Sequence, residues 1–209
     1  MKRDFDIAAK TWDLNEARTR MSSSIADAMV AVLGLTGSEV VLDYGTGTGI
    51  VALRMQPLVR QVIAADSSRG MLDVLESKLT ASGISNVRTT ILDLERDEVA
   101  IDDTHPDVIV SAMTLHHIAD TARFAATLYK LLPVGGSIAI ADLDTENGDF
   151  HTDNTGVEHF GFDRDELRRI FSSVGFESVR LSTAYDFVRP TPEGGEKTFP
   201  IFLLNASRP

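Results

Sequence analysis

Residues 40–50 have the sequence VVLDYGTGTGI, an apolar run that ends in an acid and continues into three glycines at alternate positions. The pattern is typical of a buried strand that leads into a tight turn. Because glycine lacks a Cβ and adopts positive φ at little cost, the backbone N–H groups of Gly45, Gly47 and Gly49 can approach a ligand closely. The stretch therefore predicts a nucleotide-binding turn between a strand and a helix.

The residues after the turn separate it from two common nucleotide-binding motifs. The dinucleotide fingerprint G-x-G-x-x-G/A requires Gly or Ala where this chain has Ile50. A P-loop requires Lys and then Ser or Thr, and no lysine follows Gly49 within reach. NAD, FAD and triphosphate binding are therefore disfavoured, and a purely structural tight turn stays an alternative.

Composition limits the class of protein. The chain has 209 residues, 43% of them hydrophobic, which suits one domain over residues 1–209. A net charge of -11 would repel a phosphate backbone, so we expect no nucleic acid partner. The sequence has no apolar run of about 18 residues and no signal-peptide core, which favours a cytoplasmic protein without a membrane partner. The absence of cysteine excludes disulfides, a Cys-based zinc site and a thiol nucleophile. A small molecule is the expected partner.

Apolar runs alternate with helix-like stretches along most of the chain. Residues 11–33 have helical spacing, and we expect residues 1–37 to form an N-terminal helical cap before a core over residues 38–209. The alternation within the core indicates a parallel sheet covered on both faces. After the first strand, the expected strands cover residues 61–65, 87–92, 107–110 and 137–141, and the expected helices cover residues 49–55, 68–82 and 120–132.

The pattern changes after Asp163. Acidic residues open a helix there, and Gly175 is a typical C-cap. Residues 177–188 and 197–205 then predict two strands joined by the turn-rich segment 189–196. An antiparallel pair is expected to complete the sheet.

The glycine turn resembles motif I of the class I S-adenosylmethionine-dependent methyltransferases. That motif is an acid followed by three alternate glycines, and Asp43, Gly45, Gly47 and Gly49 match it. The resemblance covers roughly residues 38–209. It implies an α/β fold with a Rossmann-like seven-stranded sheet in the order 3-2-1-4-5-7-6, strand 7 antiparallel, and helices on both faces. It also implies S-adenosyl-L-methionine as the cofactor.

Acidic residues also follow the second and third expected strands. Asp66 is one of them, and a carboxylate can accept hydrogen bonds from both hydroxyls of a ribose. By resemblance, Asp93 accepts from the adenine amino group and the Leu94 N–H reaches the ring; a plain loop acid is the alternative at Asp66 and Asp93. For Trp12 and Met71 the alternative is a place in the core. The residues that the resemblance places at the cofactor are Trp12, Asp43, Tyr44, Gly45, Thr46, Gly47, Gly49, Asp66, Ser67, Met71, Asp93, Leu94 and Ser111.

The fourth expected strand leads into Leu115-His116-His117, which resembles motif IV of small-molecule methyltransferases, including the quinone-biosynthesis enzymes. Methyl transfer to a hydroxyl or an acidic carbon needs a base, and histidine titrates near neutrality. Adjacent histidines cannot both face one pocket, so we expect His116 to be the base, with His117 as the second candidate; bracing of the loop is the alternative. The loop over about residues 142–162 is the expected substrate lid, without a metal site, and its candidate acceptor contacts are Asp142, His151, His159 and Phe162.

These observations predict S-adenosylmethionine-dependent methyl transfer to a small-molecule acceptor by in-line displacement. A non-catalytic member of the same fold, which binds the cofactor as a sensor or an assembly protein, is the alternative. An NAD-dependent reductase is disfavoured by Ile50 and by the missing Tyr-x-x-x-Lys pair of the short-chain enzymes.

Overall fold

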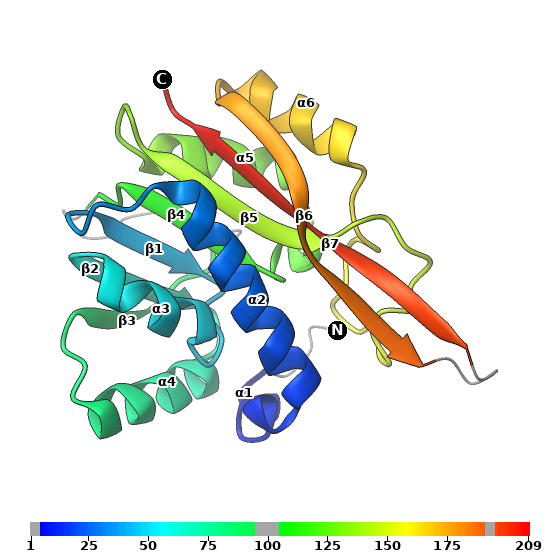
Figure 1. The fold of residues 1–209 in the computed structure, drawn as a ribbon, viewed down its shortest axis with the longest axis horizontal. Helices are drawn as coiled ribbons and strands as arrows, with labels where there is room; N and C mark the ends of the chain where they lie inside the picture. Colours follow the sequence, from blue (N-terminus) through cyan, green and yellow to red (C-terminus); the bar gives the residue numbers. More distant parts are fainter. Residues whose placement is uncertain (1–4, 95–104, 191–194) are drawn as a thin grey trace.

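A computed structural model describes residues 5–94, 105–190 and 195–209. Its mixed sheet has seven strands in the order β3-β2-β1-β4-β5-β7-β6 (Figure 1). Strands β1 to β5 run parallel, and β7 is antiparallel to β5 and β6. The expected α/β fold and strand order are confirmed. The strands are β1 (Val40–Tyr44), β2 (Gln61–Asp66), β3 (Val87–Ile91), β4 (Val108–Ala112), β5 (Ser137–Leu143), β6 (Glu177–Pro190) and β7 (Glu196–Ser207).

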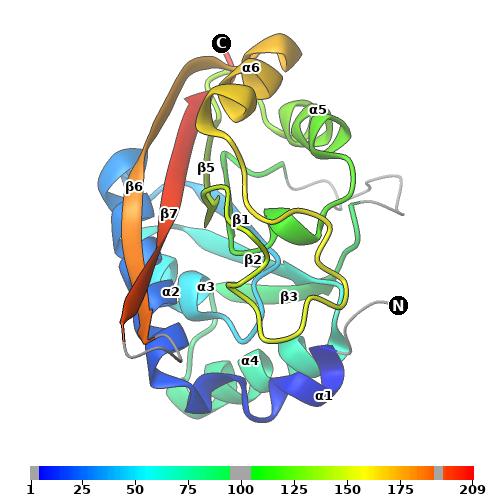
Figure 2. The same cartoon turned by 90° about the vertical axis from the view of Figure 1, so that its right-hand side faces the viewer.

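Helices cover both faces of the sheet (Figures 1 and 2). Successive side chains of a strand point to opposite faces, so Val41 packs with one core cluster and Leu42 with the other. The Val41 cluster includes residues of α2, α3 and α4, and the Leu42 cluster includes residues of α5 and α6. The helices are α1 (Phe5–Ala9), α2 (Glu16–Leu33), α3 (Ile50–Met55), α4 (Arg69–Ser82), α5 (Thr121–Leu131) and α6 (Arg164–Val174); short 3-10 turns are η1 (Trp12–Leu14), η2 (Gln56–Leu58) and η3 (Leu115–His117).

The N-terminal cap is divided into separate short elements. The helical spacing over residues 11–33 corresponds to η1 followed by α2, because Asn15 caps α2 and separates the two. The Asn15 side chain accepts a hydrogen bond from the Arg18 N–H at 3.0 Å, which satisfies one free donor of the first helical turn. Residues 1–4 of the expected cap lie outside the described residues.

Strand β5 is longer than its sequence pattern predicts. It continues to Leu143 because β7 pairs with it to the end, with Asp142 opposite Phe202 and Leu143 opposite Ile201. Asp142 therefore lies in the sheet, and the loop expected over residues 142–162 starts after Leu143. This correction matters for the site, because the side chain of a residue within a strand points to one defined face of the sheet.

The β6–β7 hairpin extends past the ends of the other strands (Figure 1). Its strands take up part of the expected turn over residues 189–196; residues 191–194 lie outside the described residues. The Arg189 guanidinium donates to the Phe150 carbonyl at 3.0 Å, so the hairpin supports the loop that follows β5. Within the described ranges, no helix has both the length and the apolar character that crossing a bilayer requires.

Candidate cofactor and acceptor site

One cavity of about 960 Å³ lies at the carboxyl ends of β1, β2 and β4. Its walls come from the N-terminal cap, the glycine turn, the ends of these strands, the η3 turn, the loop after β5 and the end of β6. The candidate residues in its wall are Trp12, Asp43, Tyr44, Gly45, Thr46, Gly47, Asp66, Ser67, Met71, Asp93, His116, His117 and His151. The candidates outside the wall are Gly49, Leu94, Ser111, Asp142, His159 and Phe162.

The glycine turn has the left-handed backbone that its sequence favours. The φ angle is 72° at Gly45, 55° at Gly47 and 87° at Gly49. A Cβ on Gly45 would lie 2.2 Å from Oγ1 of Thr114, and one on Gly49 would lie 2.3 Å from Cδ1 of Leu75, so either substitution would have to displace a neighbouring side chain. A Cβ on Gly47 would meet no atom within 4 Å, and Gly47 lines the cavity. The turn thus leaves an open cradle at Gly47 that a ligand can enter.

Asp66 connects the end of β2 to this turn. Its Oδ2 accepts from the Gly47 N–H at 2.8 Å, and its Oδ1 accepts from the Ser68 N–H at 2.9 Å. Burial is the largest influence on the pKa of Asp66 and raises it above its ordinary value, although these two hydrogen bonds oppose the rise. An ionised carboxylate has about four acceptor positions, so Asp66 can hold the turn and still accept from ribose hydroxyls.

Asp43 lies beneath the turn at the end of β1. It is buried, and the Thr46 hydroxyl donates to its Oδ2 at 2.6 Å. Burial raises the pKa of Asp43 to about 7; the Thr46 hydrogen bond opposes the rise, and the nearby charge of Asp66 adds to it. A cationic ligand in the adjacent cavity would favour the charged form of Asp43, so this position suits an ammonium or sulfonium group.

Tyr44 lines the cavity and connects two of the segments that support its wall. Its hydroxyl accepts from the Leu94 N–H at 3.3 Å, and its carbonyl accepts from the Ser111 hydroxyl at 2.9 Å. The Leu94 N–H expected to reach the adenine ring is therefore bonded to Tyr44, whereas Asp93 lies in the cavity wall. Leu94 and Ser111 support this wall without forming it.

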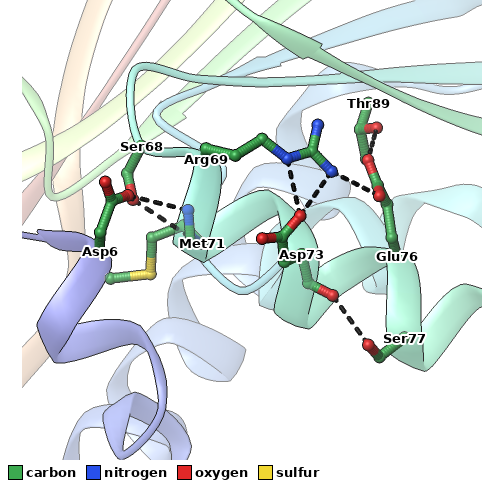
Figure 3. Close-up of polar contacts among 9 residues, drawn as sticks. Asp6, Ser68, Arg69, Met71, Asp73, Glu76, Ser77 and Thr89 are labelled. Atoms are coloured by element: carbon green, nitrogen blue, oxygen red, sulfur yellow. Dashed lines mark hydrogen bonds and ion pairs between the residues drawn. The ribbon is translucent and has the colours of Figure 1, made fainter.

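Two aspartates of the N-terminal cap, which the sequence reasoning missed, attach it to the sheet. Asp6 of α1 accepts from the Ser68 hydroxyl at 2.5 Å and from the Gly70 N–H at 2.8 Å, at the start of α4 (Figure 3). These hydrogen bonds, Ser68 first, lower the pKa of Asp6. Asp13 of η1 accepts from the Thr48 hydroxyl at 2.6 Å. The cap is therefore held directly over the glycine turn and the end of β2.

Trp12 lies in the cavity wall beside two other residues of the cap. The Phe5 ring meets the Trp12 ring edge-on, with 6.0 Å between centroids. The guanidinium carbon of Arg18 lies over the Trp12 ring, 4.0 Å from its centre, which is a cation–π geometry. Trp12 thus belongs to the cavity wall and is held there by contacts within the cap.

At the other end of the cavity, His116 and Asp142 form a buried pair. His116 is 1% exposed and Asp142 is 0% exposed. Nδ1 of His116 lies 2.8 Å from Oδ1 of Asp142, and the His116 backbone N–H donates to Oδ2 at 3.1 Å. Burial alone would raise the pKa of Asp142, but the His116 imidazole and the hydrogen bonds outweigh it and lower that pKa. Nε2 of His116 is buried and has no hydrogen-bond partner among the described residues.

Two further imidazoles lie against His116, and both adjacent histidines line the cavity, contrary to the expectation that only one of them would. Ring centroids are 4.1 Å apart for His116 and His117, and 4.9 Å apart for His116 and His151. His117 donates from Nδ1 to the Gly156 carbonyl at 2.6 Å, so it also braces the loop after β5. Within the described ranges, no group of His, Asp and Glu side chains has an arrangement that would hold a metal ion.

His159 and Phe162 are expected as acceptor contacts, but they lie outside the cavity wall and contact the η3 turn and the core instead. His159 donates from Nε2 to the Ile118 carbonyl at 2.9 Å, and its N–H donates to the His116 carbonyl at 3.1 Å. Phe162 packs in the core against Phe202, with 6.3 Å between ring centroids. Asp142 lies behind His116 because β5 carries it into the sheet. These three residues position the loop and the histidine.

Several cavity residues had no signal in the sequence. Phe187 and Arg189 come from β6, which has no motif, yet both lie in the cavity wall. The Phe150 ring contacts the Phe187 ring edge-on, with 5.5 Å between the ring centroids. Met113 has φ of 54°, an unusual value for a residue other than glycine, and follows β4 directly. Met113 also lies in the cavity wall, so this unusual backbone conformation occurs at the site.

Together, the fold and the cavity define one class of protein. The strand order with an antiparallel β7 and the acid followed by a glycine turn are those of class I S-adenosylmethionine-dependent methyltransferases. The ligand crevice lies outside the carboxyl ends of the strands, where open α/β sheets bind ligands.

Comparison with known proteins agrees with this class. A family model described as a methyltransferase domain matches residues 16–181. The chain therefore belongs to the methyltransferase domain family, and S-adenosylmethionine is its cofactor.

The relatives differ in how much is known of them. An uncharacterised methyltransferase of Schizosaccharomyces pombe is 29% identical over 154 residues, which are 68% of this chain and 54% of that protein. A ubiquinone/menaquinone biosynthesis C-methyltransferase of Psychromonas ingrahamii is 30% identical over 115 residues, which are 54% of this chain and 45% of that protein. The chain thus spans about half the length of these two relatives.

A solved structure matches over the whole chain. The Haloferax volcanii protein described as a putative methyltransferase, in complex with the Trm112 methyltransferase activator, has a TM-score of 0.79 and 17% identity. The match covers 100% of this chain and 99% of that one. At this identity it shows that the fold is shared.

Proposed function

We propose that this chain transfers a methyl group from S-adenosylmethionine to a small-molecule acceptor by in-line displacement. The observation that carries the proposal is one cavity whose wall includes both Gly47, at the open cradle, and His116, at the other end. Its volume of about 960 Å³ is at the upper end of ordinary ligand pockets, which suits two ligands side by side. A shared cavity allows the two reacting atoms to be aligned, and alignment is the main task in such a displacement.

The acids along the cavity support one orientation of the cofactor. Asp93 would hold the adenine, Asp66 the ribose and Asp43 the cationic methionyl end, in the order of their strands across the sheet. When bound, S-adenosylmethionine supplies a methyl group on a positively charged sulfur. The charged form of Asp43 then faces a cation, which offsets the burial that raises its pKa in the ligand-free protein.

The cap and the loop after β5 would cover the space between the two ligands and limit its contact with water. Asp6 and Asp13 hold the cap over the glycine turn, and His117 holds the loop through Gly156. A closed cavity strengthens the electrostatic contacts inside it and protects the methyl group from hydrolysis. Its aromatic wall at Phe150 suits a compact acceptor better than a polymer.

A binding experiment and a turnover experiment test the proposal. In calorimetric titrations we expect micromolar binding of S-adenosylmethionine and S-adenosylhomocysteine and no binding of NADH. We then expect S-adenosylhomocysteine to be released from S-adenosylmethionine when a suitable acceptor from a small-molecule panel is present. Binding without turnover on any acceptor would support the non-catalytic alternative. Absence of binding by both sulfur compounds would refute the proposal.

A further inference from the structure

The buried pair of His116 and Asp142 has no explanation in binding of the cofactor. The two residues come from different elements, η3 and β5, and are 26 positions apart in the chain. Asp142 lies in the sheet behind His116, and His116 lies between Asp142 and the cavity wall to which it belongs. A buried ion-pairing group at the edge of a cavity is a typical sign of a functional role.

We propose that His116 is the general base for an acceptor whose attacking atom is a hydroxyl oxygen, and that Asp142 is the positioning residue that sets the tautomer of His116. The inference rests on the methyl transfer proposed above. It adds the chemical class of the acceptor and a role for Asp142.

The hydrogen bonds of Asp142 determine which nitrogen of His116 carries the proton. Its Oδ1 accepts from the Leu143 N–H at 2.7 Å, and its Oδ2 accepts from the His116 N–H. Hydrogen bonds from two backbone N–H groups favour the ionised form of a carboxyl, so Asp142 acts as an acceptor toward the imidazole. The contact at 2.8 Å to Nδ1 therefore requires that Nδ1 carries a hydrogen. In the neutral ring, Nε2 then holds the lone pair.

The position of Nε2 indicates what the acceptor must provide. Nε2 is buried without a hydrogen-bond partner among the described residues, and a buried acceptor atom left without a partner costs about 1 to 3 kcal/mol. A hydroxyl donor entering the cavity would remove this cost. An alcohol or phenol is also a weak nucleophile until its proton leaves, so a base within hydrogen-bond reach has its largest effect on such acceptors.

The surroundings of His116 favour a ring as the body of the acceptor. Phe5 meets the His117 ring edge-on at 5.4 Å, and Phe150 meets the His151 ring edge-on at 4.9 Å. These rings all belong to the wall of the cavity that His116 also lines. Aromatic walls prefer edge-on or offset contacts with another ring, so the acceptor class that fits is a phenol.

The chemical step balances with the groups present. The phenol oxygen forms a bond to the methyl carbon while the carbon–sulfur bond breaks, and the electron pair of that bond stays on sulfur. The phenol proton passes to Nε2 of His116. The resulting imidazolium faces the Asp142 carboxylate at 2.8 Å, and its proton leaves to solvent when the products depart. No oxidant or further reactant is required.

The test compares two acceptors that differ in their need for a base. The probes are 4-methylphenol, which is protonated at about pH 8, and 4-nitrophenol, which is largely ionised there. We expect Asp142→Asn to lower kcat for 4-methylphenol at least about 100-fold and kcat for 4-nitrophenol less than about 10-fold. An equal loss for both acceptors would mean that Asp142 is merely structural and would overturn the inference. Asp144→Asn is the matched control, because Asp144 bonds to Arg164 at 2.7 Å instead of to a histidine.

Two further measurements separate the possible failures. Nitrogen NMR of the imidazoles should show His116 with the proton on Nδ1 in the wild type and on Nε2 in Asp142→Asn, where the amide can donate. If Asp142→Asn does not fold, His116→Gln should show the same selective loss on 4-methylphenol. Wild-type protein that binds S-adenosylhomocysteine but methylates neither phenol would overturn the acceptor class. Protein that does not bind S-adenosylhomocysteine would instead refute the proposed function.

Discussion

Asp43 should make the stability of the ligand-free protein depend on pH, and Asp43→Asn should remove that dependence. The carboxyl group is 1% exposed, and burial raises its pKa from 3.8 to about 7. Because the folded pKa is the higher one, the folded state keeps a proton that the unfolded state releases between these values. The contribution of Asp43 to stability is therefore fully present below about pH 4 and is lost as the pH rises through about 7.

The size of the effect follows from the shift. One pKa unit corresponds to about 1.4 kcal/mol, so the whole shift corresponds to about 4 kcal/mol. Between pH 5 and pH 8 the free energy of unfolding of the wild type should fall by about 2 to 3 kcal/mol relative to Asp43→Asn. Asparagine has the shape of a protonated aspartate and can accept from the Thr46 hydroxyl, but it does not titrate.

Urea denaturation with linear extrapolation, at about pH 5, 6, 7 and 8, measures this difference. Other acids titrate in both proteins, so their contributions cancel when the two free energies are subtracted. Asp66 interacts electrostatically with Asp43 and is the exception, and the double variant with Asp66→Asn measures that coupling. Free energies of unfolding that stay parallel over this range would refute the assignment of a buried, proton-holding Asp43.

Three other outcomes are expected. Asp66→Ala should weaken binding of S-adenosylhomocysteine at least about tenfold, because a charge-assisted contact is lost. The control Asp73→Ala changes an exposed residue and should leave the Kd within about twofold. Calorimetry that finds equal Kd values for the two variants would show that Asp66 is only a loop residue. Gly47 and Gly34 both have left-handed backbone with free space where a Cβ would go. Replacing either with Ala should therefore lower the free energy of unfolding by about 1 kcal/mol. Only Gly47→Ala should also weaken cofactor binding, tenfold or more. Asp6→Ala should release α1 from the start of α4 and so increase hydrogen exchange of the α1 amides. The Kd for S-adenosylhomocysteine should also become several-fold weaker. Unchanged hydrogen exchange would show that Asp6 does not hold the cap.

Local sequence accounts well for the glycine turn and its neighbours. A few neighbouring residues are enough to recognise the acid with its alternate glycines, and also the acids that follow β2 and β3. The carboxyl ends of parallel strands share one edge of the sheet, so these acids are expected to lie close together. That is why Asp43, Asp66 and Asp93 could be assigned to one site before any contact was known, and all three lie in the cavity wall.

Contacts between distant segments account for what the sequence did not predict. Asp6 and Ser68 are 62 positions apart, and neither belongs to a motif that specifies the other. Asp142 has the appearance of a loop acid because it follows an apolar run, but pairing with β7 keeps it in the sheet. His159 and Phe162 were expected in the site for their side chains, whereas their backbone connections direct them to the η3 turn and the core.

The sequence by itself determined the fold class, because a strand, a glycine turn and the periodic apolar pattern are local properties of the chain. The resemblance of that turn to motif I of the class I methyltransferases implied the cofactor. Only the tertiary structure decided that Asp142 stands behind His116, that Phe187 of β6 lines the acceptor end, and that the cap closes over the turn. The physical reason is that side-chain direction depends on which strand pairs with which and where the pairing stops. Periodicity along one segment carries no information about the register of another.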